Sequence, residues 1–209
     1  MGYKDIVCFL DASEESDVRL GIAAALAATH GAHLVGIDAT VANVAESSVE
    51  LRRAGFEKTA REARIDSTFI VAASLDAGAV IHYCADLIVA PSPGGPNRAA
   101  ARHTLIERAL TESGAPMLLL PAGVKLAAVG DRALIAWNGG REALRAVHDA
   151  MPFLKRARDV TVFAFSSRPS ALQDSALLLT AHLERHGVVA RLADWTNAQD
   201  LSPVEALLA

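Results

Sequence analysis

Short apolar runs alternate along this chain with longer stretches in which apolar residues recur at helical spacing. An unbroken apolar run is typical of a strand buried on both faces of a parallel sheet, and the periodic stretches are typical of the helices that cover it. Five runs predict strands in the first part of the chain: Asp5–Leu10, Ala32–Asp38, Ser67–Ala72, Asp86–Ala90 and Pro116–Pro121. Because strands and helices alternate with short connections, we predict an α/β fold with a doubly wound parallel sheet.

Helices are predicted between these strands. The first is expected to begin after Ser13, which is a good N-cap residue, and to end at Gly31 as its C′ residue. The residues expected on its inner face, at helical spacing, are Val18, Ile22 and either Ala25 or Leu26. The later helices of this part are predicted at Val44–Arg64, Ser74–Tyr83 and Asn97–Glu112.

The same pattern restarts after residue 131. Residues 133–149 repeat residues 6–20, and Asn138 stands 127 residues after Asp11 in the equivalent position. An offset of that size indicates two copies of one domain rather than a solenoid repeat. The restart predicts the elements Ala133–Trp137, Arg141–Leu154, Val160–Phe165, Ala171–His186, Val188–Trp195 and Pro203–Leu208. We therefore predict a complete domain at 1–121, a linker at 122–131 and a partial second domain with three strands at 132–209, in which Pro152 kinks or ends its helix.

Composition and charge restrict the function. Hydrophobic residues make up 52% of the 209 residues, charged residues 21%, and the formal net charge is −4. No run of Lys or Arg is long enough to follow a phosphate backbone, so nucleic acid is not an expected partner. No apolar run approaches membrane-spanning length and the N-terminus has no signal-peptide pattern, so we expect a cytoplasmic protein without a membrane partner. Cys8 and Cys84 have no CxxC companion and are interpreted as buried thiols.

Several stretches resemble the universal stress proteins. In the first half these are Asp11-Ala-Ser-Glu-Glu-Ser16, Gly31-Ala-His-Leu-Val-Gly-Ile37 and Asp86-Leu-Ile-Val-Ala90. The second half, with Ala136-Trp-Asn-Gly-Gly-Arg-Glu-Ala-Leu-Arg-Ala146 and Leu183-Glu-Arg-His-Gly-Val188, resembles the tandem-domain bacterial form of that family. The resemblance implies a five-stranded parallel sheet in the order 3-2-1-4-5, usually dimerised through its last strand, and a role in the stress response.

Some members of that family bind ATP, and the resemblance implies where a nucleotide would lie. The family's Asp after the first strand corresponds to Asp11, its adenine contact to Ala39, and its phosphate loop G-x-x-G-x9-G-[S/T] to the segment that begins at Pro91. Pro91 replaces the first Gly, and Thr104-Leu105 stand where Gly-Ser or Gly-Thr is expected. Because proline has no N–H to offer a phosphate, we expect a degraded loop without tight ATP binding in the first domain. The candidate residues for binding ATP or AMP are Asp11, Ala12, Ser13, Ala39, Gly94, Gly95, Arg98, Asn138, Gly139 and Gly140.

The second copy differs from the first at the same positions. Asn138 replaces the Asp and is followed by two glycines, and Phe165 corresponds to Ala39. Its phosphate loop would follow a fourth strand, which these residues do not include. Without that strand, Ala133–Trp137 is an apolar edge with unpaired N–H and C=O groups, which favours pairing with another chain. We therefore expect a truncated chain or a half-domain completed by a second protomer, with a homodimer or pairing to a second copy of the fold as the partner.

Two other residue pairs could bind ions but are interpreted as structural. Arg98 and Arg102 are four residues apart and could hold an anion, but we favour a solvated helix face. His182 and His186 have the i, i+4 spacing of zinc ligands. However, Leu183 follows the first His where H-E-x-x-H requires Glu, so no metal site is predicted.

Catalysis has little support from the sequence. A nucleophile–base pair at Cys84 and His82 depends on geometry that spacing does not define, and no serine lies in a G-x-S-x-G setting. We therefore predict a non-enzymatic stress-response protein that acts through binding and dimerisation. The alternative is an adenine-nucleotide-dependent switch or weak ATPase at the Asp11 and Asn138 turns. An adenylating enzyme ranks third, because the turn at Asn138 resembles an S-G-G-x-D-S loop without its Ser and Asp.

Overall fold

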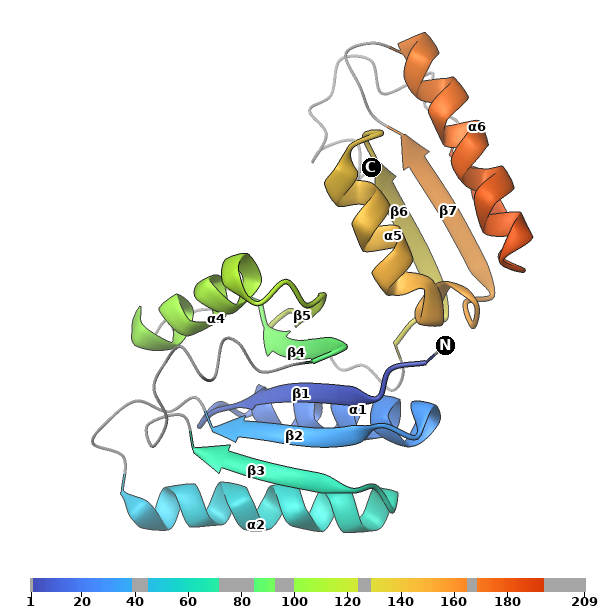
Figure 1. Cartoon of the computed structure of the whole chain (residues 1–209). Coiled ribbons are helices and arrows are strands. Elements are labelled where there is room, and N and C mark those ends of the chain that lie inside the picture. Colours follow the sequence, from blue (N-terminus) through green and yellow to red (C-terminus); the bar gives the residue numbers. More distant parts are fainter. Residues whose placement is uncertain are drawn as a thin grey trace. The chain divides into compact units, whose positions relative to one another are not determined.

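The computed structural model describes residues 2–38, 45–71, 85–92, 100–123, 129–164 and 169–193, with side chains for all of these except 100–105 and 169–173. The predicted helices Ser74–Tyr83 and Pro203–Leu208 lie outside the described residues. Contacts within the chain divide it into two compact units, Met1–Val129 (unit 1) and Gly130–Ala209 (unit 2). Each unit is built on its own parallel sheet (Figure 1).

The described strands of unit 1 form a five-stranded parallel sheet in the order β3-β2-β1-β4-β5 (Figure 1). The strands are β1 (Asp5–Leu10), β2 (His33–Asp38), β3 (Ser67–Val71), β4 (Leu87–Pro91) and β5 (Met117–Leu120). None of their ends differs from the predicted end by more than one residue. The predicted fold class and strand order are therefore confirmed.

Helices cover both faces of this sheet, which explains why its strands are continuous apolar runs. Helix α4 (Ala100–Glu112) lies on one face, where its Ile106 and Ala109 pack into a core with alternate strand residues. Those strand residues are Val7, Phe9, Val35, Ile37, Ile88 and Ala90. Helices α1 (Glu15–His30) and α2 (Glu46–Ala63) contact one another and pack on the other face.

A glycine in β2 allows α2 to approach the sheet closely. A Cβ added at Gly36 would lie 2.6 Å from the ring of Phe56, far inside van der Waals contact. Phe56 is one of the two buried residues of α2, with Ala60 as the other, and its ring also meets that of Phe69 at 5.6 Å between centroids. The position of α2 therefore depends on the absence of a side chain at Gly36.

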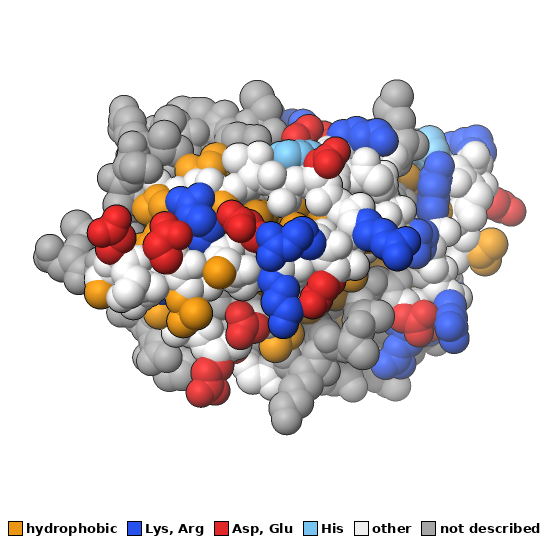
Figure 2. Space-filling view, turned by 90° about the horizontal axis from the view of Figure 1, so that it is seen from below, with side chains coloured by type: hydrophobic (Ala, Val, Ile, Leu, Met, Phe, Trp, Pro, Cys, Tyr) orange, Lys and Arg blue, Asp and Glu red, His pale blue; other side chains and the backbone are white. Residues whose placement is uncertain are grey.

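The outer face of α2 carries charges of both signs. Within the helix, Arg53 pairs with Glu50 at 3.4 Å and Arg61 with Glu57 at 3.7 Å. Figure 2, which views the molecule from below Figure 1, shows Lys and Arg side chains interspersed with Asp and Glu over this face. Exposed pairs of this kind contribute little stability, so packing at Phe56 holds the helix.

The start of α1 differs from the prediction. Ser13 does not cap the helix, because Glu14 occupies the N-cap position without a side-chain hydrogen bond. The N–H of Ser13 instead donates to Oδ1 of Asp11 over 2.7 Å, so Asp11 organises the turn in the manner of an Asx-turn. At the other end Gly31 closes the helix in the left-handed region, at φ 60°, as predicted.

The predicted inner face of α1 is wrong in its phase. Ile22 is buried as expected, but Val18 is 40% exposed, and of the two alternatives Ala25 is exposed and Leu26 half-buried. The buried residues of the helix are Ser16, Arg19, Leu20, Ile22, Ala23, Ala24 and Ala27. The physical reason is Arg19, whose guanidinium finds acceptors at the end of β1 and therefore turns inward.

The described strands of unit 2 repeat half of this architecture. Strands β6, β7 and β8 form a parallel sheet in that order. Figure 1 shows β6 and β7 of this sheet with α5 and α6 alongside. The elements are β6 (Arg132–Trp137), α5 (Arg141–Leu154), β7 (Asp159–Ala164), α6 (Pro169–Arg185) and β8 (Ala190–Leu192). Helix α5 ends two residues after Pro152, in agreement with the prediction. Strand β8 begins two residues after the predicted start at Val188, and the predicted end at Trp195 lies outside the described residues.

The core of unit 2 lies between its sheet and the two helices. Strand residues such as Ile135, Trp137 and Val162 pack there against Val147 of α5 and Leu183 of α6. On the opposite face of β6, Leu134 is 54% exposed and Ala136 is also exposed. These two residues stand 127 positions after Val7 and Phe9, which are both buried beneath α4 in unit 1.

Candidate functional site

Two buried aspartates lie at the carboxyl ends of neighbouring strands in unit 1. Asp11 directly follows β1, and Asp38 is the last residue of β2, paired in register with Leu10. The carboxyl edge of a parallel sheet is the edge at which doubly wound proteins bind ligands. The candidate nucleotide residues Asp11, Ala12 and Ser13 therefore lie at the appropriate edge.

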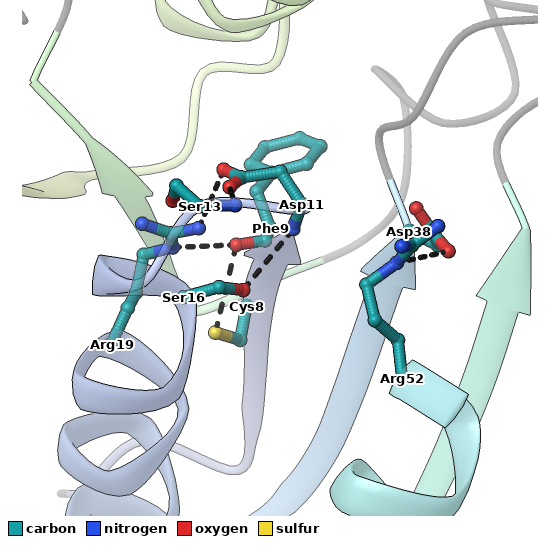
Figure 3. A network of polar contacts seen from close by, with 8 residues as sticks. All are labelled: Cys8, Phe9, Asp11, Ser13, Ser16, Arg19, Asp38 and Arg52. Carbon is teal, nitrogen blue, oxygen red and sulfur yellow. Dashed lines mark hydrogen bonds and ion pairs between the residues drawn. The ribbon is translucent and has the colours of Figure 1, made fainter. Parts of the chain in front are cut away.

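Arg19 of α1 forms an ion pair with the carboxylate of Asp11. Its Nη2 donates to Oδ2 of Asp11 over 2.7 Å, and its Nε donates to the carbonyl of Phe9 over 2.6 Å (Figure 3). The side chains of Arg19 and Asp11 are 1% and 4% exposed. Oδ1 of Asp11 accepts the N–H of Ser13, and the N–H of Asp11 donates to Oγ of Ser16 over 3.1 Å. Both carboxylate oxygens thus have partners inside the protein.

Asp38 is held in the same way by the next helix. Nε of Arg52 in α2 donates to Oδ2 of Asp38 over 2.9 Å, and the Asp38 side chain is fully buried (Figure 3). Each of the two strands that end here is therefore tied to the helix that follows it by a buried Asp–Arg pair. Each buried carboxylate is tolerated because a guanidinium of opposite charge is bound to it.

Cys8 lies beneath this network but is unsuited to chemistry. Its thiol is buried, and burial raises its pKa to about 12, with Arg19 lowering and Asp11 raising it to smaller extents. A thiol with so high a pKa is hardly ionised near neutral pH and is a poor nucleophile. The interpretation of Cys8 as a buried thiol agrees with its environment, and Cys84 lies outside the described residues.

The end of β4 offers few donors to a phosphate. Pro91 ends the strand and has no N–H. The N–H of the next residue, Ser92, donates to the carbonyl of Leu120 in β5 over 2.8 Å. The other candidate residues of unit 1, namely Ala39, Gly94, Gly95 and Arg98, lie outside the described residues.

The equivalent turn of unit 2 is more open. Oδ1 of Asn138 accepts the N–H of Gly140 over 2.8 Å, Gly139 has φ 74°, and Gly140 holds the N-cap position of α5. Ala146 stands 127 residues after Arg19, so the Asp–Arg pair of unit 1 is replaced by Asn and Ala. Asn138 and Gly139 are exposed, in contrast to Asp11.

Pattern reasoning did not identify Arg19, Asp38 or Arg52. An arginine flanked by apolar residues and eight positions after an aspartate was the available signal for Arg19. His148 was not identified either. Its ring centroid lies 5.5 Å from that of His182, and the ring centroids of His182 and His186 lie 4.6 Å apart. Among the described residues, no group of three or more His, Cys, Asp or Glu side chains is arranged to hold a metal ion.

Solved structures resemble the whole of this arrangement. A universal stress protein from Archaeoglobus fulgidus DSM 4304 matches with a TM-score of 0.64, at 14% identity over 97% of this chain and 82% of its own. A protein from Pseudomonas aeruginosa UCBPP-PA14 assigned to the same family matches with a TM-score of 0.50, at 15% identity over 92% of this chain and 75% of its own. A universal stress protein in complex with cAMP matches 59% of this chain at 19% identity, with a TM-score of 0.45. In sequence, neither a family model nor a curated protein matches.

The strand order and the turn after β1 define a doubly wound α/β protein. More particularly, the chain has the universal stress protein fold, with the complete sheet in unit 1 and a three-stranded portion of it in the described residues of unit 2. In the part of the chain that the structure describes, no helix is both long and apolar enough to cross a membrane.

Proposed function

We propose that this chain acts in the stress response by binding and association rather than by catalysis, and that it pairs with a second copy of itself through the free edge of β6. The free edge is the side of β6 that does not bond to β7. The fold supports a role of the universal stress type, and the arrangement of unit 2 supports the mode of association.

The position of β6 carries the proposal. Its counterpart β1 is paired with β2 on one side and β4 on the other, whereas among the described strands β6 pairs with β7. Leu134 of β6 is 54% exposed, while the equivalent Val7 is buried. An apolar strand with unpaired backbone groups on one edge favours pairing with another strand.

A second copy of β6 fits this edge in an antiparallel orientation. A two-fold axis at Leu134 would place this residue opposite its own copy, and Ala133 opposite Ile135 of the second copy. This register keeps the residues of each sheet face on the same face of the joined sheet, so the cores under α5 remain on one side. The two half-sheets would then form one sheet with β6 strands at its centre.

The candidate nucleotide contacts of unit 1 are used within the protein, which supports a function independent of ATP. Asp11 is bound by Arg19 and by the N–H of Ser13, and Pro91 and Ser92 have no N–H to spare. Each hydrogen bond to a charged group that a nucleotide forgoes here costs about 1.5–3 kcal/mol. Two such losses weaken binding by at least roughly a hundredfold. The described residues of unit 1 therefore do not fit ATP well.

Sedimentation velocity over about 1–200 µM protein tests the association. The wild-type chain is expected to sediment as a dimer, and Leu134→Lys, which places a charge at the proposed axis, is expected to sediment as a monomer. Leu177→Lys on α6 is the matched control, because Leu177 is exposed to a similar extent, 52% against 54%, but lies away from β6. It should remain a dimer. A wild-type monomer throughout this range, or a dimer unaffected by Leu134→Lys, would rule out pairing at β6.

The second candidate is an adenine-nucleotide-dependent switch or weak ATPase with ATP or AMP at the Asn138 turn. The exposure of Asn138 and Gly139 favours it, because a ligand can reach this turn without displacing a buried pair. Calorimetric titration with ATP and Mg²⁺ distinguishes the two proposals. Micromolar binding that Asn138→Ala abolishes would establish the switch, and phosphate release above background would be required for an ATPase. Absence of heat up to millimolar nucleotide excludes the switch and the ATPase, and leaves the proposal of association standing.

A further inference from the structure

Three histidines of unit 2 gather where α5 packs beside α6. His182 of α6 is the central one: its ring centroid lies 5.5 Å from that of His148 on α5 and 4.6 Å from that of His186, one turn further along α6. Nε2 of His182 is shielded from solvent and has no hydrogen-bond partner among the described residues. Leu179 and Leu183, on either side of His182 in the sequence, are buried in the core of unit 2. Because these two leucines anchor α6 to the core, they fix the position of the His182 backbone between them.

The groups that act on His182 are all basic. They are His148 from α5, and His186 and Arg185 from α6 itself. Beneath the two helices, β6 and β7 contribute apolar residues such as Ile135 and Val162 to the core. Burial, and then repulsion by His186, His148 and Arg185, hold the pKa of His182 below its ordinary value of 6.5.

We propose that His148, His182 and His186 form an acid-sensitive latch between α5 and α6, which is closed while the central ring of His182 is neutral and opens when that ring takes up a proton. A positive charge on His182 would lie among basic side chains, and a proton on its Nε2 finds no acceptor among the described residues. Opening moves α6 away from α5 and exposes the central ring to water. The latch confers pH sensitivity on unit 2.

The direction of the effect follows from proton linkage. In the closed state His182 binds a proton less readily than it does when α6 has moved away. The closed state is therefore favoured fully above the ordinary histidine pKa and is progressively lost as the pH falls below it. Each proton gained on opening raises the opening equilibrium by up to about tenfold per pH unit in this range.

The structure supplies a reporter of α6 docking. Nε1 of Trp137 in β6 donates to Oγ of Ser175 in α6 over 3.1 Å. The chain has two tryptophans, so Trp195→Phe leaves Trp137 as the reporter in the otherwise intact chain. On lowering the pH from about 7.5 to 5.5, we expect a change in Trp137 fluorescence. Over the same range, amide exchange in α6, corrected for its intrinsic pH dependence, should rise by up to about tenfold, while exchange in α1 stays constant.

Variants at the cluster decide whether the histidines are responsible. His182→Leu keeps an apolar body without a protonation site, and His148→Gln changes an exposed residue, so it tests the latch even where His182→Leu fails to fold. His182→Leu should abolish the acid response and His148→Gln should reduce it, whereas His33→Gln in unit 1, whose ring contacts Thr68 at 2.9 Å, should leave it intact. A wild-type chain without an acid response, or an undiminished response in His148→Gln, would overturn the latch.

Discussion

The guanidinium of Arg19 meets the carboxylate of Asp11 over 2.7 Å inside unit 1, and both side chains are almost completely buried. Arg19 also donates to the carbonyl of Phe9, so a single side chain ties α1 to the carboxyl end of β1. The same contact uses the carboxylate that the family resemblance assigns to a nucleotide. One arginine therefore both fixes α1 to β1 and binds the carboxylate of Asp11.

Removing one partner of this pair should be costly. Arg19→Met leaves Asp11 buried without its counter-charge, and we expect the free energy of unfolding of unit 1 to fall by about 3–5 kcal/mol. Adding Asp11→Asn to Arg19→Met removes the uncompensated charge and should recover much of that loss. Chemical denaturation, monitored by circular dichroism, measures both changes.

Arg108→Met is the control for charge removal in general. Arg108 pairs with Glu112 on the surface of α4 at 3.1 Å, and both side chains are 40% exposed, so its loss should cost at most about 1 kcal/mol. Equal losses for Arg19→Met and Arg108→Met would show that the buried pair has no special role.

Gly36 and Gly21 should respond to alanine in opposite directions. At Gly36 the new Cβ would meet the Phe56 ring at 2.6 Å, so Gly36→Ala overpacks the contact between α2 and the sheet and should cost about 1–3 kcal/mol. Gly21 lies within α1 with no atom within 4 Å of an added Cβ, so Gly21→Ala should gain about 0.5–1 kcal/mol in helix propensity. Thermal or denaturant unfolding of the two variants checks the difference in sign.

Cys8 should resist thiol reagents in the folded protein. Burial raises its pKa to about 12, so at pH 8 only roughly one thiol in ten thousand is ionised, even before access is considered. In a Cys84→Ser background, modification by a thiol-reactive dye should require denaturant. Rapid labelling of the folded chain would contradict the burial of Cys8.

Much of the fold could be predicted because its signals are local. Unbroken apolar runs located each described strand of unit 1 to within one residue, and the repeat of β1 and its turn at Asn138 located the second sheet. The strand order, by contrast, came from the resemblance to the universal stress proteins. Gly31 ended α1 as expected because a left-handed position there favours glycine.

The errors share a physical cause. Apolar periodicity placed Val18 on the inner face of α1 and took no account of Arg19. A carboxylate and a carbonyl at the end of β1 bind Arg19, which is buried while Val18 is exposed. The same carboxylate took the N–H of Ser13, which displaced Ser13 from its expected capping role. Contacts between different elements, such as His148 of α5 with His182 of α6, cannot be predicted from the spacing of residues within one helix.

Backbone hydrogen exchange in β6, followed as a function of protein concentration, tests most directly the proposal that the chain pairs through this strand. We predict that β6 amides not bonded to β7 exchange more slowly as the concentration rises from about 1 to 200 µM. The amides of β1, which is paired on both sides, should exchange at a rate independent of concentration. Exchange in β6 that is equally independent of concentration would contradict the proposal.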